Sequence, residues 1–125
     1  MVKFSVLGNH LHLIVEADDS VALSRGMQSL GTRLAIALNK MLGRKGTLFA
    51  DHYHSHLLLT PAEVANALAY VRTNAQKHYG RIELDYFSSE HPEWRDLLAA
   101  PISWLLDVGW RLARRKRSRN PARRR

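Results

Sequence analysis

Residues 3–16 read KFSVLGNHLHLIVE, and this stretch decides the fold. Apolar residues alternate on both sides of a Gly-Asn pair, which predicts two strands joined by a tight turn. Side chains two apart on a strand share a face, so His10 and His12 would stand side by side while Leu11 and Leu13 point into the core. Two imidazoles on one face make half of a metal site, because an open divalent site takes about three protein ligands. The alternative is two partly buried histidines bonded to a carboxylate or carbonyl.

Length and composition bound the class of protein. The 125 residues suffice for one domain with a single core. The absence of cysteine excludes disulfides and thiolate metal sites and is compatible with a reducing cytoplasm. With no signal peptide and no apolar run of about eighteen residues, we expect a cytoplasmic protein without a membrane partner.

The net charge of +8 is unevenly distributed. Nine of the 19 Lys and Arg residues lie from Arg111 onward, where there is no acid, and residues 1–110 hold ten bases and all eleven acids. A basic tail on a near-neutral body suggests a polyanionic partner, most often nucleic acid. The alternative is a solvated, disordered tail that keeps the protein soluble.

A long amphipathic helix is predicted after the second strand. Asp18-Asp19-Ser20 can cap its start, and Gly43 stops it. Its apolar residues recur every three to four positions, at Leu23, Met27, Leu30, Leu34, Leu38 and Leu42. We expect this stripe to pack across the sheet. Arg25 and Arg33 fall on the polar face, which is most simply solvated, although both could contact DNA phosphates.

A basic turn, Arg44-Lys45-Gly46, leads into a histidine-rich segment. Residues 47–59 read as a strand or extended segment, in which His52, His54 and His56 would share one face. Three histidines on one face could bind zinc, but no cysteine or acid lies at a convincing spacing. A polar strand that faces DNA is the favoured alternative.

The next helix has a clear start. Thr60-Pro61-Ala62-Glu63 combines a capping box with proline at the first helical position, and Gly80 ends the helix. Its predicted core stripe is Val64, Leu68, Val71 and Ala75. Tyr70 and Asn74 lie one turn apart beside this stripe, so a nucleophile and an amide ligand could project to one point. The alternative is a half-packed tyrosine and an asparagine in solvent.

After Gly80 the pattern is weaker. We expect a loop over 81–87, a turn over 88–93, a short helix around 94–99 and another helical segment within 101–117. The tryptophans Trp94, Trp104 and Trp110 are expected to be packing anchors in preference to platforms for DNA bases.

Several blocks of the sequence resemble one known family. They are residues 8–15 (GNHLHLIV), 23–29 (LSRGMQS), 48–55 (LFADHYHS) and 69–74 (AYVRTN). In this order they resemble the single-tyrosine transposases of the HUH endonuclease superfamily, and within them the REP-associated tyrosine transposases. Residues 100–106 with Gly109-Trp110 are similar to the C-terminal hook of one branch. The resemblance divides the chain into a catalytic domain (1–80), a helical hook (81–110) and a basic tail (111–125).

The resemblance implies an activity and its residues. In the family a tyrosine attacks single-stranded DNA, often beside a hairpin, to give a 5′-phosphotyrosine. Carried over by position, Tyr70 is the nucleophile, and His10, His12 and Asn74 hold Mg²⁺ or Mn²⁺. The candidate DNA-binding residues in the body of the chain are Arg25, Arg33, Arg44, Lys45, His54 and Lys77. A homodimer is a further expectation.

The implied fold is α+β, a ferredoxin-like HUH domain with an antiparallel sheet. This sequence opens on the hairpin, so we expect an N-terminally truncated domain that lacks the usual first strand and helix. The exposed edge of the histidine strand would then pair with the last strand or with a second chain, or the protein would fold poorly. Two functional alternatives are a non-catalytic DNA-binding remnant and a metal-dependent hydrolase without a covalent step.

Overall fold

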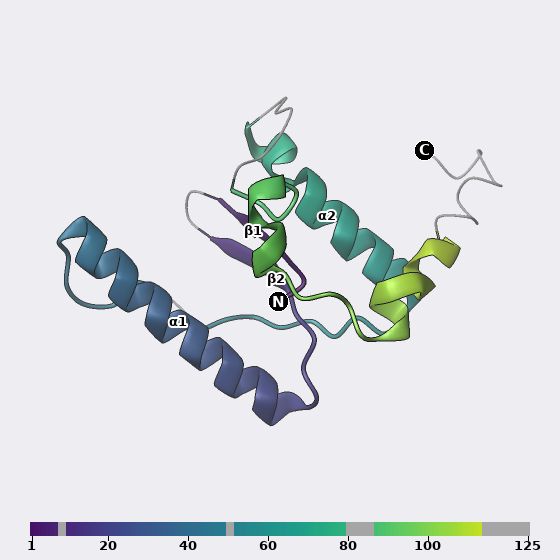
Figure 1. Cartoon of the computed structure of the whole chain (residues 1–125), viewed down its shortest axis with the longest axis horizontal. Helices are drawn as coiled ribbons and strands as arrows, with labels where there is room; N and C mark the ends of the chain where they lie inside the picture. The colour runs from purple at the N-terminus through teal and green to yellow at the C-terminus, as the bar shows by residue number, and fades with distance from the viewer. Residues whose placement is uncertain (8–9, 50–51, 80–86, 114–125) are drawn as a thin grey trace. The chain divides into compact units, whose positions relative to one another are not determined.

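The computed structural model (Figure 1) describes residues 1–7, 10–49, 52–79 and 87–113, with the backbone alone for 75–79. These residues form a two-stranded antiparallel sheet and four helical segments, which confirms the α+β class. The chain divides into two compact units, one of Met1–Glu16 with Leu58–Arg125 and the other of Ala17–Leu57. Each unit is described by itself. No helix in the described ranges is both long and apolar enough to cross a membrane.

The predicted hairpin is confirmed. Strands β1 (Lys3–Val6) and β2 (Leu11–Ile14) pair antiparallel, with Ser5 directly opposite His12. His10 lies one residue before β2. Because directly opposed residues share a sheet face, Ser5 and His12 project to the same side of the hairpin.

The expected assignment of the two sheet faces is wrong. We predicted that Leu11 and Leu13 face the core, but both are only half-buried, whereas Ile14 is 6% exposed and belongs to the core cluster. On β1, Val6 is 41% exposed and Ser5 is fully buried. The reason is the helix that covers the hairpin, because it packs on the face that carries the histidines.

The outer edge of β1 is covered by a segment from much later in the chain. Ser88 forms a β-bridge with Ser5, and Ser89 N donates to Phe4 O at 2.9 Å. We considered pairing of a last strand with the histidine strand. In the described residues the chain instead returns to β1, at the opposite edge of the sheet.

Helix α2 (Pro61–Tyr79) starts as predicted. Glu63 N donates to Thr60 Oγ1 at 3.2 Å, while Glu63 Oε2 accepts from Thr60 N at 3.2 Å and from Leu59 N at 2.7 Å. The reciprocal bonds pair backbone N–H groups that a helix start leaves without partners. The capping box therefore fixes the first residue of α2.

The core of the first unit lies between the hairpin and α2 (Figure 1). Its buried residues are Val2, Ile14, Val64, Val71 and Leu106, each at most 7% exposed. Val64 and Val71 are two turns apart on α2, and Leu68 packs against them half-buried, as predicted. The predicted stripe residue Ala75 has its side chain outside the described part of the chain.

Ile102 and Ser103, which follow η1 (Pro92–Leu97) in the chain, are hydrogen-bonded to the residue that ends the hairpin unit, Glu16. Glu16 accepts hydrogen bonds from Ile102 N at 2.8 Å, Ser103 N at 2.9 Å and Ser103 Oγ at 2.6 Å. Burial raises the pKa of the Glu16 carboxyl, but these hydrogen bonds outweigh burial and hold the pKa below its usual value. An ionised Glu16 therefore favours the folded position of Ile102 and Ser103.

Two short helical segments are observed where a helix around 94–99 and a helical segment within 101–117 are expected. Segment η1 (Pro92–Leu97) is a 3₁₀-helix, and η2 (Leu105–Gly109) is a π-helical turn within a longer helical run. Trp110 packs against the core, as a packing anchor would. A Cβ on Gly109 would lie 2.6 Å from the Trp104 ring, so any larger residue here would force that ring to shift.

The second unit contains the other long helix. Helix α1 (Ser20–Leu42) begins where Asp19 Oδ1 accepts from Ala22 N at 2.7 Å, and it ends at Gly43, whose φ is 64°. Both predicted boundaries are confirmed. The predicted packing of α1 on the sheet stays a prediction, since its unit is described separately.

The sequence predicts a strand or an extended segment over 47–59, and the strand is not observed. Its described residues, 47–49 and 52–59, form neither helix nor strand. A strand needs a partner for its backbone groups, and the described part of this unit supplies only a helix.

Candidate functional site

The histidine pair is held by the start of β2. The rings of His10 and His12 lie edge to face, with centroids 4.7 Å apart and an interplanar angle of 90°. His10 is exposed, whereas the Nε2 atom of His12 is buried. The predicted side-by-side arrangement is confirmed.

Tyr70 reaches this pair from α2. Its ring centroid lies 5.1 Å from that of His12, at an interplanar angle of 86°. Tyr70 is 37% exposed, so its side chain is both packed against a histidine and open to solvent. A group intended to react with a large substrate needs both properties, because packing fixes its direction and exposure gives access.

Asn74, one turn after Tyr70, is the most informative residue of the site. It is fully buried, and neither Oδ1 nor Nδ2 has a hydrogen-bond partner among the described residues. The alternative of an asparagine in solvent is therefore wrong. An unpaired buried amide costs about 1–3 kcal/mol, and such a group in a native fold needs an explanation, such as a ligand.

The chemistry of these side chains fits a divalent cation. An amide oxygen and two imidazole nitrogens are all metal ligands, and the unpaired Asn74 amide has capacity for one. Nitrogen ligands suit Mn²⁺ better than Mg²⁺, which prefers oxygen ligands alone. All three groups are neutral when they bind a metal, so an anionic substrate would offset the charge of the ion. No group of three or more His, Asp or Glu side chains in the described ranges could hold a metal by itself.

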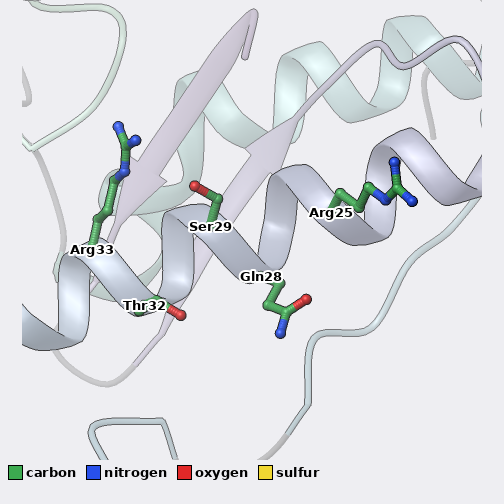
Figure 2. A pocket seen from close by; sticks show the side chains of 5 residues that line it. All are labelled: Arg25, Gln28, Ser29, Thr32 and Arg33. Carbon is green, nitrogen blue, oxygen red and sulfur yellow. The ribbon is translucent and has the colours of Figure 1, made fainter.

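A second candidate surface lies on α1 (Figure 2). Five side chains, Arg25, Gln28, Ser29, Thr32 and Arg33, line a shallow pocket. Arg25 and Arg33 are eight residues apart, which separates their backbone positions by about 12 Å along the helix, and Gln28, Ser29 and Thr32 lie between them in the sequence. All five groups can donate hydrogen bonds to phosphate oxygens.

The other candidate DNA-binding residues are less concentrated. Arg44, Lys45 and His54 are exposed in the Ala17–Leu57 unit, and Arg44 Nη2 donates to Thr47 O at 3.1 Å. The side chain of Lys77 lies outside the described residues, as does the chain beyond 113. The structure therefore places Arg25 and Arg33 in one pocket.

The zinc alternative for the second histidine group gains no support from the geometry. His52, His54 and His56 are exposed, and they do not lie on a strand that would align them.

One buried residue beside the site was missed from the sequence. Ser5 lies opposite His12 on the helix-covered face of the hairpin, where it is 0% exposed to solvent and its Oγ has no hydrogen-bond partner among the described residues. The hairpin register could have placed it there, because the turn position fixes which residues face each other. The candidate site thus comprises two histidines, a tyrosine and two buried polar groups. No family model, curated protein or solved structure matches this chain.

Proposed function

We propose that this protein is a metal-dependent transposase or endonuclease that cleaves and rejoins single-stranded DNA through a 5′-phosphotyrosine. The observation that carries this proposal is the buried, unpartnered amide of Asn74, one turn after a tyrosine whose ring contacts His12. The resemblance to single-tyrosine HUH transposases supplies the roles of these residues. A ferredoxin-like HUH fold is part of the proposal, and a hairpin covered by a helix supports it.

The proposed reaction conserves the phosphodiester energy. The phenolic oxygen of Tyr70 attacks a DNA phosphorus, an O–P bond forms, and the P–O3′ bond breaks to release a 3′ hydroxyl. The phenolic proton passes to solvent, and the leaving O3′ takes up a proton. Attack by a 3′ hydroxyl on the phosphotyrosine reverses the sequence and rejoins DNA. No external energy source is required.

His10, His12 and Asn74 would hold Mg²⁺ or Mn²⁺. When bound, the ion polarises the phosphate oxygens and offsets negative charge in the transition state. A phenol has a pKa of about 10 and is a weak nucleophile at neutral pH, so this stabilisation is needed. The packing of Tyr70 on His12 keeps the phenol beside the ligand set.

A second candidate is a DNA-binding protein that does not cleave. The arginine pocket on α1 favours it, because phosphate contacts there do not require Tyr70. A metal-dependent hydrolase without a covalent step is the third alternative, and its activity would not need a tyrosine.

The test is incubation of the chain with end-labelled single-stranded hairpin DNA and Mn²⁺, followed by a denaturing gel. We expect a protease-sensitive shifted band that Tyr70→Phe abolishes. Tyr53→Phe, at an exposed tyrosine of the other unit, is the matched control and should retain the band. Cleavage that survives in Tyr70→Phe would indicate a hydrolase, and binding without cleavage would indicate the non-catalytic protein.

A further inference from the structure

Trp104 is an exposed tryptophan in the helical run that contains η2. It is 58% exposed, whereas Trp110, six residues later, packs against the core. Leu106 lies between them in the chain and is buried in the same core, so the inner side of the run is anchored without Trp104. The expectation that the tryptophans are packing anchors fits Trp110 and does not account for Trp104.

The ring of Trp104 rests with one face against Gly109. A Cβ on this glycine would lie 2.6 Å, 2.8 Å and 3.0 Å from three consecutive atoms of the six-membered ring, Cζ3, Cε3 and Cη2. Such similar distances place the glycine over a ring face, because an approach within the ring plane would leave the neighbours of the nearest atom clearly farther away. Backbone therefore covers one face of the ring, and the exposure of Trp104 leaves the opposite face open to solvent.

The chain is fixed on both sides of Trp104. Before it, the Glu16 carboxylate accepts hydrogen bonds from the backbone N–H groups of Ile102 and Ser103. After it, the π-helical turn η2 brings together residues five apart, which is the spacing of Trp104 and Gly109. Turns of this kind are frequent at functional sites. A ring that is already held in place loses little conformational freedom when a ligand stacks on it.

The charge of the neighbouring sequence indicates which ligand fits this open ring face. Arg111 is exposed, and it is the first of the nine Lys and Arg residues that end the chain without an acid. A ligand that matches both features carries planar groups for the ring and negative charge for the basic side chains. Single-stranded nucleic acid carries both, and its unpaired bases stack on aromatic side chains, whereas the bases of a duplex are stacked on one another.

We infer that Trp104 is a stacking platform for an unpaired base of single-stranded DNA. The platform uses none of the candidate-site residues, such as Tyr70 and Asn74, but the inference rests on the proposed function for its choice of DNA as the ligand. Stacking of this kind tolerates any sequence, because every base has a π face. Removal of one stacking ring lowers affinity by about 5- to 150-fold.

The experiment measures the affinity of the full chain for short fluorescent strands by anisotropy, in EDTA so that no strand is cleaved. One strand is oligothymidylate, and the other is an abasic strand of the same length, which has phosphates and no bases. We expect Trp104→Ala to lower affinity for oligothymidylate by about 5- to 150-fold. The abasic strand should lose less than about twofold, because its phosphate contacts remain.

Three further variants separate stacking from other roles of Trp104. Trp104→Phe keeps an aromatic face and should retain most of the affinity for oligothymidylate, whereas Trp104→Leu, which is apolar but not planar, should lose it. These two variants decide the question if Trp104→Ala does not fold, as judged by thermal unfolding. Ile102→Ala is the matched control, because Ile102 is 90% exposed and apolar but has no planar face, and it should bind both strands like the parent.

Several results would overturn the platform. Parent-like affinity for oligothymidylate in Trp104→Ala or Trp104→Leu would do so and leave the proposed function standing, as would equal losses on the two strands. Binding to phosphatidylserine vesicles that both Trp104→Ala and Ile102→Ala weaken, with parent-like affinity for DNA, would identify a membrane-binding surface in its place. A parent chain that binds neither strand would overturn the proposed function, and this inference with it.

Discussion

Replacing Asn74 with leucine separates the metal role of this residue from a structural role. The two side chains have nearly the same shape, so the substitution removes the amide and creates no large cavity. Because Asn74 is fully buried and its amide has no partner in the described residues, the parent bears a cost of about 1–3 kcal/mol that leucine removes. For a chain of this size, that gain raises the melting temperature by about 4–12 °C in EDTA.

Mn²⁺ should reverse the order of the two melting temperatures, so that the parent melts above Asn74→Leu. At a concentration of about 100 times Kd, binding adds about 2.7 kcal/mol to the stability of the parent, whereas Asn74→Leu has lost one ligand and gains less. The assay is thermal unfolding by circular dichroism across a Mn²⁺ titration. Asn66→Leu, at an exposed asparagine of the same helix, is the control and should retain the response to Mn²⁺. The reasoning is refuted if Asn74→Leu melts below the parent in EDTA, or if both respond equally to Mn²⁺.

Three further predictions concern other parts of the chain. Replacing both Arg25 and Arg33 by glutamine should weaken binding to single-stranded DNA and lower the magnitude of the slope of log K against log salt by about 1.4. The control Arg95→Gln, at another exposed arginine, should leave the slope closer to the parent value. Gly109→Ala should cost about 1 kcal/mol in urea unfolding, at the low end for overpacking, because the clashing tryptophan ring is 58% exposed and can move outward. The pKa of Glu16 is lower in the folded state than in the unfolded state, so the ionised carboxylate stabilises the fold at any pH above the unfolded-state pKa. This stabilisation is lost as the pH falls through the folded-state pKa. Melting temperatures between neutral pH and about pH 3 should therefore depend less on pH in Glu16→Gln.

Features set by local chemistry could be predicted from the sequence. The capping box at Thr60 and Glu63 and the stop at Gly43 each depend on a few neighbouring residues, and both were placed correctly. The hairpin was likewise predictable from its alternation and turn.

Features set by tertiary packing could not be predicted from the sequence. The alternation in β1 and β2 is compatible with either face being covered, and the helix covers the face that carries Ser5 and His12. Asn74 lies beside the apolar stripe of its helix, where burial depends on how wide the contact with the sheet is. The segment 47–59 has strand-like composition, but strands form only when another strand is available to pair.

The central claim is that Tyr70 becomes covalently attached to DNA, and mass spectrometry of the attachment site tests it most directly. After reaction with hairpin DNA and Mn²⁺, nuclease and trypsin digestion should leave a nucleotide on the peptide of residues 46–72, which contains both Tyr53 and Tyr70. Fragmentation of that peptide distinguishes the two tyrosines. The account predicts the nucleotide on Tyr70. Cleaved DNA with no modified peptide, or a nucleotide on Tyr53, would contradict it.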